Sequence, residues 1–211
     1  MTEKDSLDEL TGRIPALESC KKEIGEAAVL ISGCFENGGK LLLCGNGGSC
    51  ADADHMVGEL MKSFEKKRSL PEDLKKRLRT LAGERGAYLA DHLQEAFPAI
   101  SLCAHSSLLT AISNDMDADL VFAQQVAAYG VEGDVLLAIS TSGNSRNVRD
   151  AALSAKAKGM TVIGLTGRSG GILKPYCDVS VCVPAERTAD VQEYHLPVYH
   201  TICRMIENRL I

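Results

Sequence analysis

Five short apolar runs recur along the chain, each bounded by polar or glycine-rich segments. They are five or six residues long, and apolar residues follow one another in them without regular alternation. Continuous apolar runs of this length are typical of strands that are buried on both faces of a parallel sheet. The predicted strands are residues 40–44, 99–103, 135–140, 161–166 and 179–183.

Segments with helical periodicity lie between these runs and flank them. A long first helix is predicted over residues 15–36, where an apolar stripe ends at Gly38-Gly39. The other predicted helices are residues 49–63, 106–113, 118–129, 145–158 and 188–210. Alternating strands and helices predict an α/β fold, a three-layer, doubly wound sandwich of flavodoxin-like type around a five-stranded parallel sheet. We expect residues 1–211 to form a single domain.

One segment, residues 64–96, interrupts this alternation. It carries two further helical patterns, SLPEDLKKRLRTLAG and GAYLADHLQEAF, and is predicted to be an inserted helical hairpin. Ser69 and Glu72 have the spacing of a capping box. The leucines expected on one helix face are Leu70, Leu74, Leu78 and Leu81. Residues 62–85 hold nine basic and four acidic side chains, which indicates either a basic docking surface or, as we prefer, a solvated face of the hairpin.

Composition and charge restrict the classes of function. The chain has 211 residues and a formal net charge of −5, which gives no reason to expect nucleic acid or anionic lipid as a partner. No apolar run approaches the roughly 20 residues of a membrane span, and the acidic start lacks the features of a secretory signal. The eight cysteines lie mostly in apolar segments without a CxxC motif and are predicted to be reduced thiols. We therefore expect a cytoplasmic protein.

Gly45-Asn46-Gly47-Gly48-Ser49 connects the first predicted strand to a helix. Such a glycine-rich junction lets the backbone approach a ligand closely. The spacing is neither that of the dinucleotide fingerprint GxGxxG nor that of the phosphate loop GxxxxGK(S/T). By itself the motif fits a tight turn as well as a ligand-binding loop.

A second loop, STSGNS at residues 140–145, follows the most apolar strand and opens a predicted helix. Its hydroxyl groups are those of Ser140, Thr141, Ser142 and Ser145. One hydroxyl would suffice for helix capping, while the free N–H groups and the dipole at a helix N-terminus favour an anion. Because the loop has no lysine, it suits a phosphate monoester on a small molecule better than a triphosphate with magnesium.

Two pairs of polar side chains are spaced so that each pair shares a helix face. His55 and Glu59 are four residues apart on the helix that leaves the glycine-rich junction, and Gln192 and His200 are eight residues apart on the last helix. The two faces together could hold one metal ion or supply an acid and a base to one substrate. Taken singly, His55 and Glu59 each fit an ordinary structural role better than a functional one.

Asn114 and Asp115, in the sequence SND, lie between two predicted helices. Asx residues in this position are normally caps or turns. A role in holding substrate hydroxyls requires that this segment face the same pocket.

Together these motifs resemble the sugar isomerase (SIS) domain family, and within it the phosphoheptose isomerase branch. The resemblance extends over residues 15–64 and 97–210 and rests on CGNGGS with His55 and Glu59, on SND, on STSGNS and on TADVQEYHLPVYH. It implies an isomerase that interconverts ketose and aldose phosphates through an enediol(ate), most closely sedoheptulose 7-phosphate and D-glycero-D-manno-heptose 7-phosphate. It also implies a homotetramer with active sites between subunits. We expect the first helix in the interface, because its apolar stripe has no obvious partner within one sandwich.

The same resemblance implies a role for each motif residue. Residues that would bind substrate are Asn46, Gly47, Gly48, Asn114, Asp115 and Gln192, and those that would hold its phosphate are Ser140, Thr141, Ser142 and Ser145. One zinc ion per subunit would be held by His55, Glu59, Gln192 and His200. Glu59 and His200 would also serve as catalytic base and acid. These residue types suit the reaction, because a carboxylate can carry a proton between adjacent carbons while a Lewis acid or hydrogen-bond donors stabilise the enediolate.

Three features depart from the family pattern. They are the long hairpin, Ala189 where some members carry aspartate, and Pro197 inside the last helix, which is expected to kink it. They weaken the assignment of one particular sugar. Two alternatives stay open: an isomerase for another phosphosugar, and a non-catalytic SIS-domain binding protein such as a factor that associates with the replication initiator. Glu59 favours the enzyme, because that binding branch lacks a carboxylate at this position.

Overall fold

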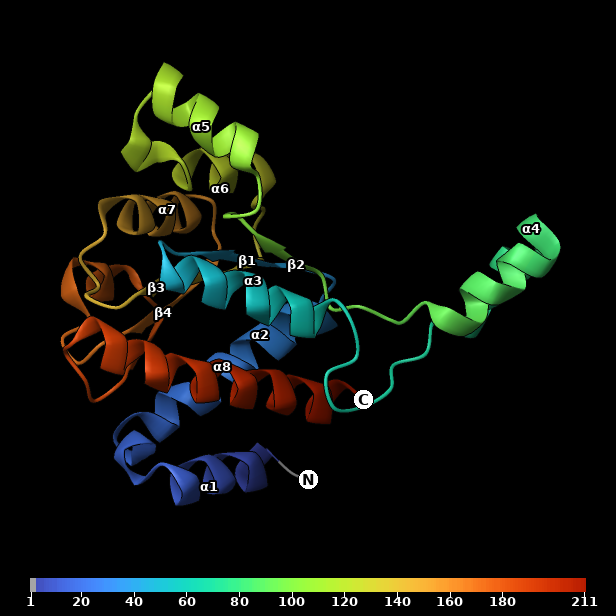
Figure 1. The fold of residues 1–211 in the computed structure, drawn as a ribbon, viewed down its shortest axis with the longest axis horizontal. Helices are drawn as coiled ribbons and strands as arrows, with labels where there is room; N and C mark the ends of the chain where they lie inside the picture. The colour runs from blue at the N-terminus through green and yellow to red at the C-terminus, as the bar shows by residue number, and fades with distance from the viewer. Residues whose placement is uncertain (1–2) are drawn as a thin grey trace.

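The computed structural model describes residues 3–211 and, within them, a sheet of five parallel strands (Figure 1). The strands are β1 (Leu41–Cys44), β2 (Ala99–Ser101), β3 (Val135–Ser140), β4 (Thr161–Thr166) and β5 (Val179–Cys182). They lie in the order β2-β1-β3-β4-β5, and every neighbouring pair is parallel. The chain winds outwards from β1 towards one edge and from β3 towards the other, so the predicted doubly wound sheet is confirmed.

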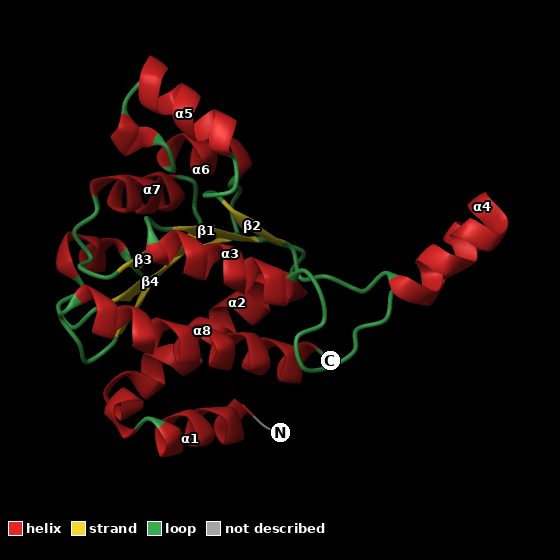
Figure 2. Cartoon of the chain, in the orientation of Figure 1, coloured by secondary structure: helices red, strands yellow, loops and turns green. Residues whose placement is uncertain are grey.

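Helices cover both faces of the sheet, as a three-layer sandwich requires (Figures 1 and 2). One face is covered by α2 (Lys21–Glu36), α3 (Gly48–Leu60) and α8 (Thr188–Leu210), and the other by α6 (Ala123–Tyr129) and α7 (Arg146–Ala157), with α5 (Ser106–Asp115) beyond them. Successive residues of β1 show the division. Leu41 and Leu43 join the core shared with α2, α3 and α8, whereas Leu42 and Cys44 join the core shared with α6 and α7. All four side chains are fully buried, as expected for a strand covered on both faces.

The N-terminal segment differs from the prediction. Instead of one helix over residues 15–36, a short 3-10 helix (Pro15–Cys20) precedes α2, and a separate helix α1 (Glu3–Arg13) precedes both. The break falls at Cys20, whose φ of −127° and ψ of 14° lie outside the helical region. The predicted helix 118–129 is divided similarly, into a 3-10 turn (Ala118–Leu120) and α6. The sequence pattern missed α1 because Leu7 and Leu10 are its only large apolar residues.

The apolar stripe of α2 does not lack a partner within the subunit. Ile24, Ala27 and Ile31 are fully buried, and α2 packs against α8 and β5 of the same chain. The supposed absence of such a partner was the reason to expect this helix at a subunit interface. That reason is wrong, because the stripe forms part of the subunit's own core.

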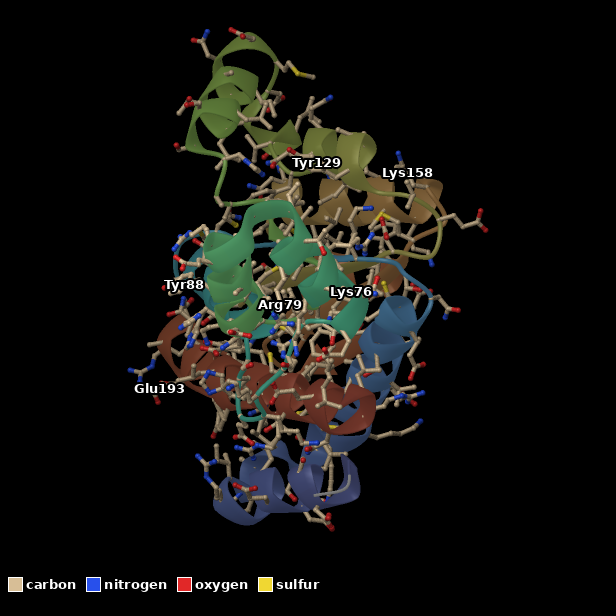
Figure 3. The ribbon with its side chains drawn as sticks, turned by 90° about the vertical axis from the view of Figure 1, so that its right-hand side faces the viewer. Lys76, Arg79, Tyr88, Tyr129, Lys158 and Glu193 are labelled. Carbon is tan, nitrogen blue, oxygen red and sulfur yellow. The ribbon has the colours of Figure 1, made fainter. Side chains whose placement is uncertain are left out.

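Residues 64–96, here called the arm, project from the body formed by residues 3–63 and 97–211 (Figures 1 and 2). The arm carries α4 (Glu72–His92), whose backbone leaves the helical conformation at Ala82 and at Gly83, where φ is 49°. Glycine adopts this positive φ without steric cost. The two halves run side by side (Figure 3), and a Cβ on Gly86 would collide with the carbonyl of Leu78. The predicted inserted helical hairpin is therefore confirmed.

The start of the hairpin corrects one detail of the prediction. Pro71 is the N-cap residue of α4 and gives no side-chain hydrogen bond, so the capping box of Ser69 and Glu72 is wrong. Proline fixes its own φ and has no N–H, and the helix begins directly after it. Ser69 instead pairs with Gln94 in an antiparallel bridge where the chain enters and leaves the arm. Leu81 is 85% exposed at the bend, so it does not share a buried face with the other leucines.

Candidate active site

The glycine loop (residues 45–49) and the hydroxyl loop (residues 140–145) lie next to each other at the carboxyl ends of β1 and β3. These neighbouring strands are the point where the winding direction of the sheet reverses. In open α/β sheets, ligands bind at this kind of switch point. Asn46 in the first loop and Asn147, just after the second, exchange two side-chain hydrogen bonds of 2.9 Å. The two loops are therefore joined directly.

The glycine loop needs its glycines for two different reasons. Gly47 has a φ of 56°, which only glycine adopts readily. At Gly48, a Cβ would collide with the side-chain amide of Gln192 on α8. The missing side chain thus allows α8 to approach the start of α3, and it places Gln192 at the glycine loop.

The hydroxyl loop presents its side chains at the start of α7. The hydroxyls of Ser140 and Ser145 lie 3.1 Å apart, and Ser142 Oγ accepts a hydrogen bond of 3.1 Å from the Asn144 N–H. Ser145 is the N-cap residue of α7, but its side chain makes no capping bond. Without that cap, the first N–H groups of the helix remain available to an anion.

A cavity of about 410 Å³ lies beside the hydroxyl loop. Its lining includes Thr141, Ser142, Asn144, Gly167, Arg168 and Ser169. Arg168 was not singled out from the sequence, although a basic residue two positions after the predicted strand 161–166 was a usable signal. Its guanidinium donates a hydrogen bond of 3.1 Å to the Pro184 carbonyl, and its Nε lies 3.5 Å from Glu186 Oε1, another residue that lines the cavity.

His55, Glu59 and His200 come together where α3 packs against α8. His55 Nε2 lies 3.3 Å from Glu59 Oε1, and the rings of His55 and His200 meet edge to face with centroids 5.0 Å apart. The other oxygen of Glu59 accepts a hydrogen bond of 2.7 Å from Lys62 Nζ. The structure therefore brings together three of the four residues predicted on the two helix faces, while Gln192 lies at the glycine loop. Helix α8 is continuous through Pro197.

The surroundings of Glu59 and His200 shift their pKa values. Burial raises the pKa of Glu59, but the hydrogen bond and charge of Lys62, together with the two histidines, leave it below its usual range. Burial lowers the pKa of His200, and the neighbouring His55 lowers it further. His200 Nε2 is buried without a hydrogen-bond partner among residues 3–211. An ionised carboxylate and a neutral imidazole are thus favoured at neutral pH.

Two residues that the sequence analysis missed complete the cluster. The Tyr199 hydroxyl lies 2.8 Å from His55 Nδ1, and the buried Oδ2 of Asp52 has no hydrogen-bond partner among residues 3–211. Burial raises the pKa of Asp52. The spacing did contain a signal: Asp52 precedes His55 by three residues, and Tyr199 follows Gln192 by seven, so each lies on a helix face already of interest.

A buried ion pair fixes the root of the arm beside this cluster. Glu207 on α8 is 2% exposed and accepts hydrogen bonds of 2.9 Å from the backbone N–H groups of residues 64–66. Arg68 Nε lies 3.3 Å from Glu207 Oε1, and the arginine side chain is fully buried. The beginning of the arm is therefore anchored to the helix that carries His200.

Arg68 also connects the root of the arm to α3. Its guanidinium donates hydrogen bonds of 3.2 and 2.9 Å to the carbonyls of Glu59 and Leu60 and covers the ring of Phe97 at 4.2 Å. The last carbonyls of a helix have no partner within it. A residue of the arm thus caps the helical turn that carries Glu59. No spacing rule could predict the ion pair between Arg68 and Glu207, because 139 residues separate them in the sequence.

A family model described as SIS domain matches residues 7–85 and 89–167. The chain belongs to the SIS domain family. The phosphoheptose isomerase of Thiobacillus denitrificans is 41% identical over 202 residues, which cover 94% of this chain and 89% of that protein. The phosphoheptose isomerase of Campylobacter jejuni is 40% identical over 190 residues, with coverage of 90% and 88%. The family recognised in the sequence motifs is therefore confirmed.

Solved structures of the same branch share this SIS fold. Phosphoheptose isomerase from Neisseria gonorrhoeae matches with a TM-score of 0.73 and 36% identity, covering 95% of this chain and 96% of that one. A phosphoheptose isomerase from Francisella tularensis matches with a TM-score of 0.77 and 32% identity, covering 99% and 100%. Both pairs align over nearly their whole length, and the predicted fold class is confirmed.

Within this SIS domain, Asn114 and Asp115 stand apart from the two loops. They end α5, their side chains are exposed, and Asn114 Nδ2 donates a hydrogen bond of 2.8 Å to Asp115 Oδ1. The hydrogen bonds of residues 3–211 do not connect either side chain to the glycine loop or the hydroxyl loop. The prediction that they bind substrate stays a prediction.

The predicted zinc ligands are suitable in kind, but the three that lie near one another do not form a group that could hold a metal ion in this structure. Residues 3–211 contain no group of three or more histidine, cysteine, aspartate and glutamate side chains that could hold a metal ion. His55 and Glu59 offer adjacent nitrogen and oxygen donors, although Lys62 occupies one oxygen of Glu59. One further nitrogen fits the role of a metal ligand. His200 Nε2 is buried and has no hydrogen-bond partner among residues 3–211.

Two features of the whole chain bear on the sequence-based expectations. All eight cysteines are free thiols, as predicted. None of the helices in residues 3–211 is both long enough and apolar enough to cross a membrane.

Proposed function

We propose that this SIS domain is a phosphosugar isomerase that interconverts ketose and aldose phosphates. The substrate pair we favour is sedoheptulose 7-phosphate and D-glycero-D-manno-heptose 7-phosphate, in keeping with the names of its relatives. The observation that carries the proposal is the contact of 3.3 Å between His55 and Glu59, on the helix that leaves the glycine loop. An ionised carboxylate beside an imidazole offers the base and the acid that this proton transfer requires.

In the proposed reaction, Glu59 is the base. It removes the proton from the carbon next to the carbonyl group and returns it to the neighbouring carbon, through an enediol(ate). His200 acts as the acid and supplies a proton to the carbonyl oxygen as the enediol forms. It then takes the proton of the neighbouring hydroxyl group as the new carbonyl forms, so both side chains return to their starting state. The lowered pKa of Glu59 keeps the carboxylate ionised and able to accept a proton at neutral pH, although a pKa nearer the working pH would make it a stronger base.

The phosphate end of the substrate would bind at the hydroxyl loop. The four proposed phosphate ligands are Ser140, Thr141, Ser142 and Ser145, at the uncapped start of α7. Asn46, Gly47, Gly48 and Gln192 would hold the sugar near the glycine loop. Holding the remote phosphate supplies binding energy that orients the reacting carbons.

Zinc is part of the proposal, with His55, Glu59, Gln192 and His200 as the residues that would hold it. When bound, the ion would act as a Lewis acid and polarise the substrate oxygens. The donor types support this assignment, and so does the unpartnered Nε2 of His200. Gln192 would act through its amide oxygen, from its place against Gly48.

A homotetramer in the cytoplasm is also part of the proposal. The exposure of Asn114 and Asp115 supports a site that is completed by another subunit, in which these residues would contact sugar hydroxyls. The eight free thiols support a reducing compartment. The buried stripe of α2 gives no support to the tetramer.

The test is a screen of phosphosugars with five to seven carbons, with and without added zinc, in deuterated water. We expect turnover and deuterium at C1 or C2, highest for the heptose 7-phosphates. A preference for a shorter phosphosugar would show that the protein is an isomerase for a different substrate. The absence of exchange with every sugar would contradict the enzyme and favour a phosphosugar-binding module.

A further inference from the structure

The root of the arm, residues 64–68, contacts both members of the proposed acid–base pair. Arg68 donates hydrogen bonds of 3.2 and 2.9 Å to the carbonyls of Glu59 and Leu60. The ring of Phe64 packs against the ring of His200, with centroids 5.5 Å apart. One short segment of the arm therefore reaches the backbone of the base on α3 and the side chain of the acid on α8.

Glu207 holds both of these contacts in place. Its Oε1 accepts a hydrogen bond of 2.9 Å from the Phe64 N–H and lies 3.3 Å from Arg68 Nε. Its Oε2 accepts hydrogen bonds of 2.9 Å from the N–H groups of Glu65 and Lys66. The side chains of Arg68 and Glu207 are 0% and 2% exposed, so solvent and salt screen this ion pair much less than one on the surface.

The catalytic pair and the buried ion pair connect the same two helices. Glu207 follows His200 by seven residues, which is about two helical turns, so the two side chains lie on one face of α8. Glu59 lies in the last turn of α3, and the last turn of a helix frays unless something holds its carbonyls. Arg68 supplies that hold and ties it to α8 through Glu207.

We propose that Arg68 and Glu207 are positioning residues that fix the last turn of α3 against α8 and so set the distance between the Glu59 carboxylate and the His200 ring. Both are buried, so they act through the catalytic pair and not on the substrate. A misplacement of about 1 Å that arises far from the chemistry can cost about 100-fold in rate. The catalytic consequence rests on the proposed isomerase function, whereas the placement of the two side chains does not.

Arginine suits this role because one planar group serves both partners. Its Nη2 donates to the two carbonyls while its Nε faces the carboxylate of Glu207. Lysine carries a point charge on a flexible stem and lacks this rigid fork. Arg68→Lys therefore separates charge from geometry: Glu207 keeps a cation, but the carbonyls at the end of α3 lose their fixed donor.

Lys40 and Asp134 provide a matched control at the opposite edge of the sheet. Asp134 is 1% exposed, and its Oδ2 lies 2.6 Å from Lys40 Nζ. The two residues directly precede β1 and β3, whereas the loops of the candidate site follow these strands. Lys40→Met and Arg68→Met each leave a buried carboxylate without its cation, so both should lower the midpoint of denaturant unfolding. Only the change at Arg68 should affect the catalytic pair.

The first test reads the placement of His200 in metal-free protein without substrate. An aromatic ring shifts the NMR signals of nearby protons by an amount that depends steeply on their distance and angle, so the ring of Phe64 reports on His200. Spectra are recorded at about pH 8.5, where ordinary imidazoles are neutral, and the signals are assigned with His200→Gln. The ring signals of His200 should move in Arg68→Lys and Arg68→Met and should stay in place in Lys40→Met.

The second test measures turnover. Arg68→Lys should lower kcat about 10–100-fold, the range for a residue that holds a catalytic or metal-binding group from outside. KM should change little, because no contact with the substrate is lost. Lys40→Met should keep the kcat of the wild type although it is less stable. If Arg68→Met does not fold, Arg68→Lys decides both tests, since it retains the charge beside Glu207.

The positioning role and the isomerase function fail in different ways. Unchanged His200 signals in Arg68→Lys, or a kcat equal to that of the wild type, would overturn the positioning role. A kcat that falls equally in Lys40→Met would also overturn it, because the loss would then follow stability and not placement. If the wild type turns over no phosphosugar but the His200 signals move as expected, the isomerase function fails and the positioning role stands.

Discussion

The body and the arm are both largely helical, but their apolar side chains have different surroundings. In the body, α2, α3 and α8 bury their apolar faces against a sheet, and residues such as Ile24, Met56 and Val198 are fully inaccessible. In the arm, the two halves of α4 mainly have each other, and Leu81 and Tyr88 are 85% and 48% exposed. Figure 3 shows the arm in front of the body, with Lys76, Arg79 and Tyr88 on it.

This difference separates two sources of order. The body is stabilised by contacts between residues far apart in the sequence, whereas the arm has local contacts and local ion pairs such as Arg79–Asp91. Isolated helices of this length are marginal in water. The root of the arm, in contrast, is held firmly against the body. Arg68 belongs to the arm in sequence, but its side chain is buried and pairs with the buried Glu207 of the body.

The largest expected effect tests whether catalysis depends on residues of the body. Glu59→Gln keeps the shape and hydrogen-bonding capacity of the side chain but removes its basicity, so turnover should fall by about 10²–10⁴-fold. His200→Gln should behave similarly, and the double variant should lose little more, because the two residues act as a unit. Solvent deuterium incorporation at C1 or C2, followed by NMR, measures the exchange. Phosphate binding should survive, and full exchange by Glu59→Gln would require another base.

The next effect compares a buried ion pair at the root with an exposed one on the arm. Arg68→Met leaves Glu207 buried without its cation, and the free energy of unfolding should fall by about 3–5 kcal/mol. Arg79→Met breaks a pair whose side chains are 45% and 58% exposed, and such exposed pairs contribute about 0–1 kcal/mol. Denaturant unfolding of the two variants measures the difference. Equal losses of unfolding free energy would mean that the buried pair at the root stabilises the protein no more than the exposed pair on the arm.

A smaller effect is expected at the hydroxyl loop, in the body but remote from the arm. Ser145→Ala should weaken phosphosugar binding by about 1–3 kcal/mol, the range for a lost hydrogen bond to a charged group. Ser142→Ala should do the same. Calorimetry with the phosphorylated sugar and its unphosphorylated counterpart measures this. The unphosphorylated sugar should bind weakly to every variant, and an equal loss for both ligands would show that the loop does not hold phosphate.

The smallest effect on stability is expected from removing the arm beyond its root. Replacing residues 72–92 with a short glycine–serine linker keeps Arg68, Ser69 and Gln94, and the free energy of unfolding should change by no more than about 1 kcal/mol. The sugar preference or the mass of the assembly should change, because the arm leaves the helix that carries Glu59. A variant with the same preference and the same mass would show that the arm affects neither.

The sequence predicted those parts of the molecule that depend on local pattern. The apolar runs located β3 and β4 to the residue, and the periodicity of the last helix located both ends of α8. The same method joined the 3-10 helix to α2 across Cys20, because a single non-helical residue leaves no mark on an apolar stripe. It placed His55, Glu59 and His200 on two helix faces but could not show that those faces meet.

The remaining parts of the candidate site depend on contacts between distant residues. Tyr199 and His55 are 144 residues apart, and Phe64 and Glu207 are 143 apart. In such pairs neither residue is unusual in its own segment. Tyr199 is of a residue type that is common in protein cores, and Arg68 belongs to a basic run. Only the packing of α3 against α8 gives them a role, and that packing is a property of the whole fold.

The bridge between Ser69 and Gln94 has a consequence for how this protein can change over generations. The chain leaves the body and returns to it at one place, closed by this bridge and by the guanidinium of Arg68 on Phe97. Once the two ends of a segment are held together, lengthening it costs little, about 0.6 kcal/mol for each doubling. The root therefore makes this a position where insertions of very different length and composition can be accepted, and where a foreign segment could be grafted, without rebuilding the sheet.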